Sequence, residues 1–360
     1  RLARVRSSLE TQEEERSLKA SVVTIEGEGI RLTDALRQLQ LQSGNRVTDL
    51  REVYGAEATN PGLDLKIRDQ PFFQALDAIA REAGVKTTAF TGDGSIGLMP
   101  DAEAGLPDMI GVEPPDPLRW VRYDGPFRVA LLNIGATRDL ATGSGRANVQ
   151  MELSWEPRLR PMLLEIKSDE LEILDDQDRT VLPDVMGEST SVPLRPENPS
   201  VEVNLNMEAP ERDATRLKTL KLSGSVSAPA GLRRFRFSDL KAKDEVQTQE
   251  KIVVTLVGSE VEDQVWKLSL SVEMPGEGQV FDSYQQGLFN NRLWLERADG
   301  SRFEHNGGFS SVNLRPGVIG FEYLFVDAPG KLTDYSLVYE TPSRVVSVPF
   351  TLNFEDIPLP

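Results

Sequence analysis

Apolar and polar side chains alternate most regularly in residues 265–274. The apolar members are Trp266, Leu268, Leu270, Val272 and Met274, and Lys267, Ser269, Ser271 and Glu273 separate them. A period of two residues predicts an antiparallel strand with one buried and one solvated face. Leu293 and Leu295 then precede Asp299-Gly300, a pair that suits the positive φ angles of a tight turn. We therefore expect a hairpin that returns through Phe303.

Residues 22–100 have a different pattern of strand, helix and strand, which recurs forty positions later. Val23 and Ile25 match Leu63 and Leu65; Leu32, Ala35, Leu36 and Leu39 match Phe72, Ala75, Leu76 and Ile79; and Gly44 matches Gly84. Apolar residues at i, i+3, i+4 and i+7 predict two amphipathic helices, each ended by its glycine. Asp69 and Pro71 are expected at the N-cap and an early position of the second helix. The closing strands, 85–90 and 95–99, are expected to flank a turn at Gly92-Asp93-Gly94.

This succession resembles the short N-terminal domain of secretins and TonB-dependent receptors (STN-like domain). The resemblance is carried by Leu32 to Leu39, which reads Leu-x-x-Ala-Leu-x-x-Leu, by Ala75 to Ile79, and by Gly44, Gly84 and Gly94. It covers about 80 of the 360 residues. The resemblance implies an α+β domain with an extracytoplasmic docking role. Residues 101–360 show neither the pattern of a secretin barrel nor that of a receptor plug and barrel, so channel and transport functions are not implied.

Polar stretches divide the chain. Residues 1–21 have helical composition with a thin apolar stripe, which is typical of a helical linker. Residues 101–117 are acidic and rich in proline, which predicts a linker and a domain boundary.

Two β-rich units are expected after this linker, at residues 118–240 and 249–360. The strand containing Val149, Met151, Leu153 and Trp155 matches the strand that contains Trp266, the turn at 175–178 matches Asp299-Gly300, and 235–240 matches 352–357. About seven predicted strands in roughly 110 to 125 residues are typical of an immunoglobulin-like β-sandwich. The expected fold class is mixed: a small α+β domain of two β-α-β elements, followed by two mainly-β sandwiches. The ending, residues 356–360, resembles exported multi-domain proteins of planctomycete-type bacteria.

Composition excludes several classes of function. A net charge of −17 argues against nucleic acid as a partner, because binding to phosphates needs a basic face. The absence of cysteine excludes disulfides, thiolate metal sites and cysteine nucleophiles. No apolar run approaches the roughly 18 residues that span a bilayer, so we expect at most a peripheral membrane association. The sequence begins at Arg1, which leaves a preceding signal peptide, anchor or further domain open.

Metal and cofactor motifs are weak. The turn Asp175-Asp176-Gln177-Asp178 offers calcium candidates in Asp175, Asp176 and Asp178, although Arg179 and the missing glycine break the EF-hand pattern, and a solvated turn is the simpler interpretation. His305 is the only histidine and is expected to have a structural role at the end of a hairpin. Gly27-Glu28-Gly29 and Gly143-Ser144-Gly145 lack the further residues of a phosphate-binding loop. We expect no cofactor and no catalytic metal.

The remaining candidates are aromatic or acidic. Tyr284, Phe289 and Trp294 could form a binding surface for a sugar or a peptide, with packing in a core as the alternative. Glu296 and Glu304 could form a glycosidase-like pair, but 57 acidic residues make chance proximity the simpler explanation.

Our leading hypothesis is a non-enzymatic extracytoplasmic bacterial protein, either periplasmic or secreted to the cell surface. It would dock a partner protein or a second copy of itself through the N-terminal α+β domain, with exposed sheet edges making the contact. The alternative is a polysaccharide- or peptide-binding module that uses the second sandwich, and an enzyme ranks third.

Overall fold

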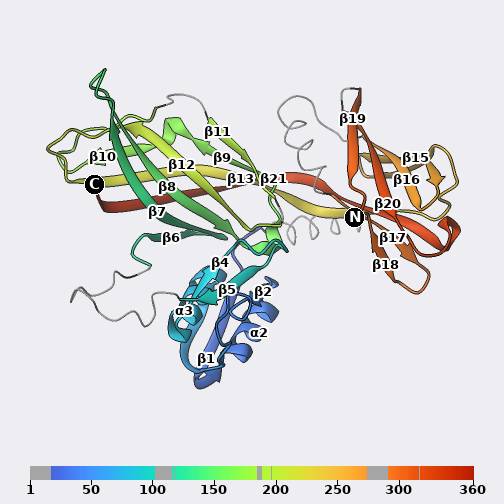
Figure 1. Cartoon of the computed structure of the whole chain (residues 1–360), viewed down its shortest axis with the longest axis horizontal. Coiled ribbons are helices and arrows are strands. Elements are labelled where there is room, and N and C mark those ends of the chain that lie inside the picture. The colour runs from blue at the N-terminus through green and yellow to red at the C-terminus, as the bar shows by residue number, and fades with distance from the viewer. Residues whose placement is uncertain are drawn as a thin grey trace, which may run out of the picture. The chain divides into compact units, whose positions relative to one another are not determined.

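The computed structural model describes residues 18–101, 116, 118–184, 189–195, 197–273, 291–315 and 317–360. The described chain is mainly β, with several sheets and two α-helices (Figure 1). It divides into two compact units, one made of residues 1–228 and 347–360 and the other of residues 229–346. Neither described helix is long and apolar enough to cross a membrane. Most of both expected linkers, 1–21 and 101–117, lies outside the described residues.

The first unit begins with an α+β region. Its elements are β1 (Val22–Arg31), α2 (Leu32–Ser43), β2 (Val47–Asp49), β3 (Gly62–Pro71), α3 (Phe72–Ala83), β4 (Val85–Thr88) and β5 (Ile96–Pro100). β1 and β3 form a two-stranded antiparallel sheet, and β2, β5 and β4 form a second sheet in that order, with β2 parallel to β5. In Figure 1, β1 lies on the opposite side of the helices from β4 and β5. The predicted repeat of strand, helix and strand is present.

The apolar stripes of both helices join one core with the inward residues of the two sheets. Its fully buried members include Leu32, Ala35 and Leu39 of α2, Phe72, Ala75 and Ile79 of α3, and Val23, Leu63 and Leu98 of the strands. Gly44 and Gly84 end the helices at φ of 72° and 64°, the left-handed region that glycine adopts without a steric penalty, as predicted.

The start of α3 differs from expectation. Pro71 itself is the residue before the first helical turn and ends β3, and no side chain caps the helix there. Asp69 lies in β3 with φ of 48°, and its backbone N–H binds Thr24 Oγ1 at 3.0 Å. Asp69 therefore lies at the irregularity between β1 and β3 and does not cap the helix.

The rest of the first unit is a pair of sheets. The strands are β6 (Val121–Asp124), β7 (Phe127–Arg138), β8 (Gly145–Trp155), β9 (Leu163–Lys167), β10 (Glu172–Asp175), β11 (Ser189–Pro193), β12 (Ser200–Glu208) and parts of β13 (Arg216–Phe237) and β21 (Tyr335–Pro358), with 3-10 turns at Pro157–Leu159 and Ser168–Glu170. One sheet has the order β12-β8-β7-β6. In the other, β11, β9, β13 and β21 are neighbours in that order, and β10 also pairs with β13.

The second unit repeats this plan. Its strands are β14 (Glu245–Gln249), β15 (Ile252–Glu262), β16 (Val265–Glu273), β17 (Arg292–Arg297), β18 (Arg302–Glu304), β19 (Phe309–Arg315), β20 (Val318–Val326) and the remaining parts of β13 and β21, with a 3-10 turn at Leu332–Asp334. One sheet has the order β14-β15-β16-β20-β19, and β13, β21, β17 and β18 form the other. Residues of both sheets share one buried core. The predicted strand at 265–273 and the hairpin at Asp299-Gly300 are confirmed, with Gly300 at φ of 84°.

Corresponding strands have the same order in the two units. β6-β7-β8-β12 in the first corresponds to β14-β15-β16-β20 in the second. The ladder between β7 and β8 shifts register between Leu131 and Asn133, and that between β15 and β16 shifts between Leu256 and Gly258. A bulge at the equivalent place supports the interpretation of these units as a repeat.

The ends of the two units differ from the expected ranges 118–240 and 249–360. β13 has 22 residues and β21 has 24, and each passes from one unit into the other. Phe235 and Phe237 belong to the core of the second unit. Phe350 packs against Phe127 of the first unit, with ring centroids 5.5 Å apart and the ring planes tilted by 58°. Each predicted unit therefore gives its last strand to the other, because alternation shows that a strand is half-buried but not which core it enters.

Candidate functional site

The aromatic candidates do not form an exposed surface within the described residues. Tyr284 and Phe289 fall in 274–290, outside the described residues. Trp294 lies in β17, where its neighbours Leu293 and Leu295 face the core. Side chains alternate along a strand, so Trp294 projects from the other face of the sheet. It is nevertheless 0% exposed.

Arginines cover Trp294 on that outer face. The guanidinium carbons of Arg234, Arg292 and Arg302 lie 5.5, 5.4 and 4.5 Å from the ring centroid. The indole Nε1 donates a hydrogen bond of 2.9 Å to Glu296 Oε2. Cation–π contacts of this kind stabilise by about 0.5–1 kcal/mol each at exposed sites. Trp294 therefore anchors arginine side chains instead of presenting an open platform.

The other rings that enrich the second unit are buried as well. They are Trp266, Phe321, Tyr323, Phe325, Tyr335 and Tyr339. Glu296 and Glu304 are engaged by arginines: Glu296 pairs with Arg236 and Arg302, and Glu304 pairs with Arg292. These carboxylates belong to the ion-pair network around Trp294.

Asp175, Asp176 and Asp178 bind protein groups. Asp175 is buried and accepts hydrogen bonds of 2.9 Å from the backbone N–H of Arg179 and 2.7 Å from its Nε. Although burial acts to raise the pKa of Asp175, these bonds outweigh it and lower the pKa. Asp176 accepts from Thr215 Oγ1 at 2.6 Å, and Asp178 pairs with Lys218. Among the described residues, no group of three acidic or histidine side chains is arranged to hold a metal ion.

His305 packs against aromatic rings. Its centroid lies 5.2 Å from Tyr323, 6.2 Å from Phe309 and 6.5 Å from Phe325, edge to face in each case. Burial lowers the pKa of His305 because it disfavours the imidazolium, and the charge of Glu304 only partly opposes this.

His305 is expected to make stability depend on pH. The unfolded imidazole takes up a proton near its ordinary pKa of 6.5, whereas the folded one does so only at lower pH. Stability is therefore expected to fall as pH decreases from about 7 to about 5.5. Because the chain has a single histidine, His305→Gln should flatten this part of the profile. Urea unfolding across that range measures it, and an equal slope in the variant would contradict the assignment.

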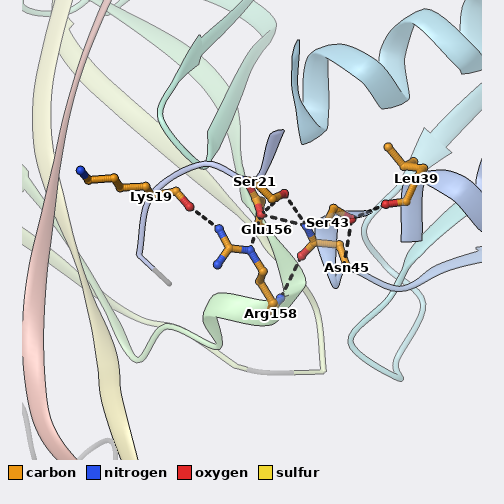
Figure 2. A network of polar contacts seen from close by, with 7 residues as sticks. All are labelled: Lys19, Ser21, Leu39, Ser43, Asn45, Glu156 and Arg158. Atoms are coloured by element: carbon orange, nitrogen blue, oxygen red, sulfur yellow. Dashed lines mark hydrogen bonds and ion pairs between the residues drawn. The ribbon is translucent and has the colours of Figure 1, made fainter. Parts of the chain in front are cut away.

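A buried polar network connects residues 19–21 and the end of α2 with the segment that follows β8 (Figure 2). Glu156, which is 0% exposed, is its centre. Its Oε1 accepts 2.7 Å from the backbone N–H of Ser21, and its Oε2 accepts 2.7 Å from Ser21 Oγ, 2.8 Å from Asn45 Nδ2 and 2.6 Å from Arg158 Nε. Four donors around one carboxylate offset the cost of burying its charge.

The partners of Glu156 are themselves fixed. Asn45 Oδ1 accepts from the backbone N–H of Arg158 at 3.1 Å, and Arg158 also donates to the carbonyl of Lys19. Ser43 Oγ accepts from the backbone N–H of Asn45 at 3.1 Å and donates to the carbonyl of Leu39 in α2 at 2.7 Å. Figure 2 shows this relay from α2 to Arg158. The network therefore ties the α+β region to the β-sandwich part of the first unit.

A second polar cluster joins α3 to β6 and β7. Asp77 Oδ2 accepts 2.5 Å from Tyr123 Oη and 2.8 Å from Arg128 Nε. Burial and the charge of Asp77 raise the pKa of Tyr123, so its hydroxyl stays a donor. Burial alone would lower the pKa of Arg128, but Asp77 outweighs this and raises it. The cluster is consequently a charged pair with a neutral tyrosine.

These two clusters are the polar sites that sequence reasoning missed. The sequence does indicate that Asp77 is buried, because it stands four residues after Phe73 and three before Ala80, on the apolar face of its helix. Nothing in the sequence around Glu156 indicates its burial, since its partner Ser21 lies 135 positions away. Neither cluster offers an accessible nucleophile or an open metal position, and both fit a role in fixing structure.

A small hollow of about 100 Å³ in the first unit is lined by Trp120, Leu131, Leu132, Asn133, Ile134, Val149, Ile357 and Pro358. Pockets for drug-sized ligands usually enclose about 300–1,000 Å³, so this one holds no more than a side chain.

Comparison with models of known protein families gave no match, and no curated protein matched the chain.

Proposed function

We propose that the protein is a non-enzymatic scaffold that docks a partner protein, or a second copy of itself, through its N-terminal α+β region. This proposal is supported by a difference between two parts of that region: one is fixed to the rest of the first unit, and the other has sheet edges without a paired strand. Two buried polar clusters fix it to the sandwich through Ser21, Asn45 and Asp77. The β1–β3 sheet, in contrast, has no further strand paired to either edge among the described residues.

β3 is the more open of these two edges. In β1, the ladder skips Thr24, whose backbone N–H binds Gln42 Oε1 at 2.9 Å and whose carbonyl accepts from Gln42 Nε2 at 2.9 Å. The α2 side chain therefore occupies this part of β1. On β3, Lys66 is exposed, whereas Asp64 accepts a hydrogen bond of 2.9 Å from the Gly29 N–H and Arg68 pairs with Glu26 at 2.8 Å, both in β1. An extended segment that added to β3 would gain backbone hydrogen bonds and find Lys66 beside it.

The domain layout is part of the same proposal. The order of strands and helices in residues 22–100 supports an STN-like domain, and the repeated strand order supports two immunoglobulin-like sandwiches as spacers. The extracytoplasmic location, periplasmic or at the cell surface of a bacterium, rests on the resemblance alone. We do not extend the proposal to polysaccharide binding, because Trp294 is covered.

The test is site-specific photo-crosslinking in cells that produce the protein. A benzophenone amino acid at the position of Lys66 is expected to yield one discrete adduct, whereas the same group at Leu41, exposed on α2, should yield none. Hydrogen exchange of the purified adduct should show protection of residues 62–71. Equal crosslinking at both positions, or protection elsewhere, would refute docking at β3.

A further inference from the structure

Residues 305–308 connect β18 of one sheet in the second unit with β19 of the other sheet, and they are hydrogen-bonded to β20. The backbone of residues 307–308 exchanges two hydrogen bonds of 3.0 Å with Leu324. Asn306 Nδ2 donates 2.8 Å to the carbonyl of Val326, and Asn306 Oδ1 accepts 2.7 Å from the N–H of the same residue. Four hydrogen bonds therefore hold this short segment on β20.

The cost of opening the 305–308 segment is small. Asn306, Gly307 and Gly308 are exposed, so water can replace the four bonds, and each bond then contributes only about 0.5–1.5 kcal/mol. A Cβ on Gly307 would meet Leu324 Cβ at 2.6 Å, so glycine is what permits the close approach to β20. Gly308 has φ of 82°. Two adjacent glycines also gain much conformational freedom when the segment leaves β20.

The ring of His305 fixes the same segment to the aromatic margin of the core. It lies edge to face with Tyr323 and Phe325 of β20 and with Phe309 of β19. Its Nδ1 is buried, and no group in the described part of the chain forms a hydrogen bond with it. A neutral imidazole can leave this nitrogen unprotonated, whereas an imidazolium would bury a charged N–H without an acceptor. The closed arrangement therefore favours the neutral ring.

The charged groups near His305 do not reverse this preference. Burial raises the pKa of Tyr323, so its hydroxyl stays neutral and supplies no anion. Glu322, the next residue of β20, projects from the other face of that strand. Glu304 favours the imidazolium, but its side chain is 55% exposed and pairs with Arg292 at 3.5 Å. Solvent screens a charge in this position.

We propose that protonation of His305 releases the 305–308 segment from β20 while the rest of the second unit stays folded. In the open form the imidazolium is hydrated, and the rings of Tyr323 and Phe325 lose their cover. The closed form binds the proton less well than the open form, so acid shifts the equilibrium towards opening. The fold would thus contain a local switch that is closed at neutral pH and opens as the pH falls below about 6.5.

Hydrogen exchange of the full chain, corrected for the intrinsic pH dependence of exchange, tests this switch. The amides of Gly307, Leu324 and Val326 donate the bonds that opening breaks. Their protection should fall several-fold between about pH 7.5 and about pH 5.5, and by no more than about tenfold per pH unit, the limit for uptake of one proton. Low urea concentrations should leave the fall unchanged, because a local opening exposes little surface.

Two variants separate the proton from the hydrogen bonds. His305→Phe keeps a ring in the aromatic cluster but cannot take up a proton, so its protection should be the same at both pH values. Asn306→Ala removes two bonds to Val326 and should lower protection at both pH values, with the several-fold ratio between them retained. Circular dichroism confirms that each variant is folded.

Four results would overturn the proposal. They are protection that does not change on acidification, protection that increases because the rings bind the imidazolium as a cation, a fall that persists in His305→Phe, and a fall that depends on urea as strongly as the exchange of β16 does. The last result would mean that the second unit unfolds as a whole. None of these outcomes bears on docking at β3, which lies in the other unit.

Discussion

Glu156→Ala is expected to lower the free energy of unfolding of the first unit by about 3–5 kcal/mol, since it leaves the half-buried Arg158 without its carboxylate and removes the acceptor of Ser21 and of the buried Asn45. Thermal and urea unfolding of the full chain measure this. Hydrogen exchange should increase first in residues 18–49, because that segment supplies the partners. The matched control is Glu170→Ala, which removes an exposed pair with Lys167 and should cost less than about 0.5 kcal/mol.

A double-mutant cycle separates the contact from general destabilisation. Asn45→Ala combined with Glu156→Ala should be less destabilising than the sum of the two single changes, with a coupling energy of about 0.5–3 kcal/mol. Additive effects, or a Glu156→Ala protein as stable as the unaltered chain, would show that the network does not hold the α+β region in place.

A fragment of residues 18–101 is expected to fold cooperatively on its own. Its core consists of twenty buried residues that all lie between Val23 and Leu98. Separation from the sandwich uncovers mainly polar groups, among them Ser21, Asn45 and Asp77, which water can solvate. Circular dichroism with a thermal melt tests this, and a melt without a cooperative transition would contradict it.

Within this fragment, Leu36→Asp should abolish folding, because a buried carboxylate without a partner costs several kcal/mol against a domain stability of about 5–15 kcal/mol. Leu36 is almost fully buried in α2, whereas Leu41 of the same helix is 79% exposed. Leu41→Asp is therefore the matched control and should melt like the unaltered fragment. A folded Leu36→Asp fragment would mean that the buried face of α2 is misplaced.

Local pattern was a reliable guide to the elements that bury one face. The apolar stripes of α2 and α3, the glycines that end them, and the alternation in β8 and β16 were all predicted, because each depends on residues only a few positions apart. The start of α3 was predicted wrongly. Aspartate is a residue type that favours helix caps, but Asp69 lies at an irregularity between β1 and β3, where its backbone N–H binds the hydroxyl of Thr24, 45 positions away.

The candidate site shows the same limit. Trp294 could be assigned to a strand but not to a face, because Leu293 and Leu295 decide the face only once the core is known. Its cover of Arg234, Arg292 and Arg302 comes from three different strands. Glu156 and Asp77 are ordinary acidic residues until distant donors surround them. The sequence does not show whether such a side chain is exposed or buried and paired, because the residues that cover it or bind it are far away in the chain.

The sequence by itself determined the half-buried strands and the two helices that end at Gly44 and Gly84, since these depend on the period of apolar side chains and on glycines a few positions away. Only the tertiary structure decided where the last strand of each repeat belongs. Phe235 and Phe237 enter the core of the second unit, and Phe350 enters the first. The reason is physical: hydrophobic burial is non-directional, so an alternating strand is stabilised equally by any complementary apolar face. β13 and β21 are single strands of 22 and 24 residues, each long enough to continue from one unit into the other, and this continuation decides which apolar face the end of each strand meets.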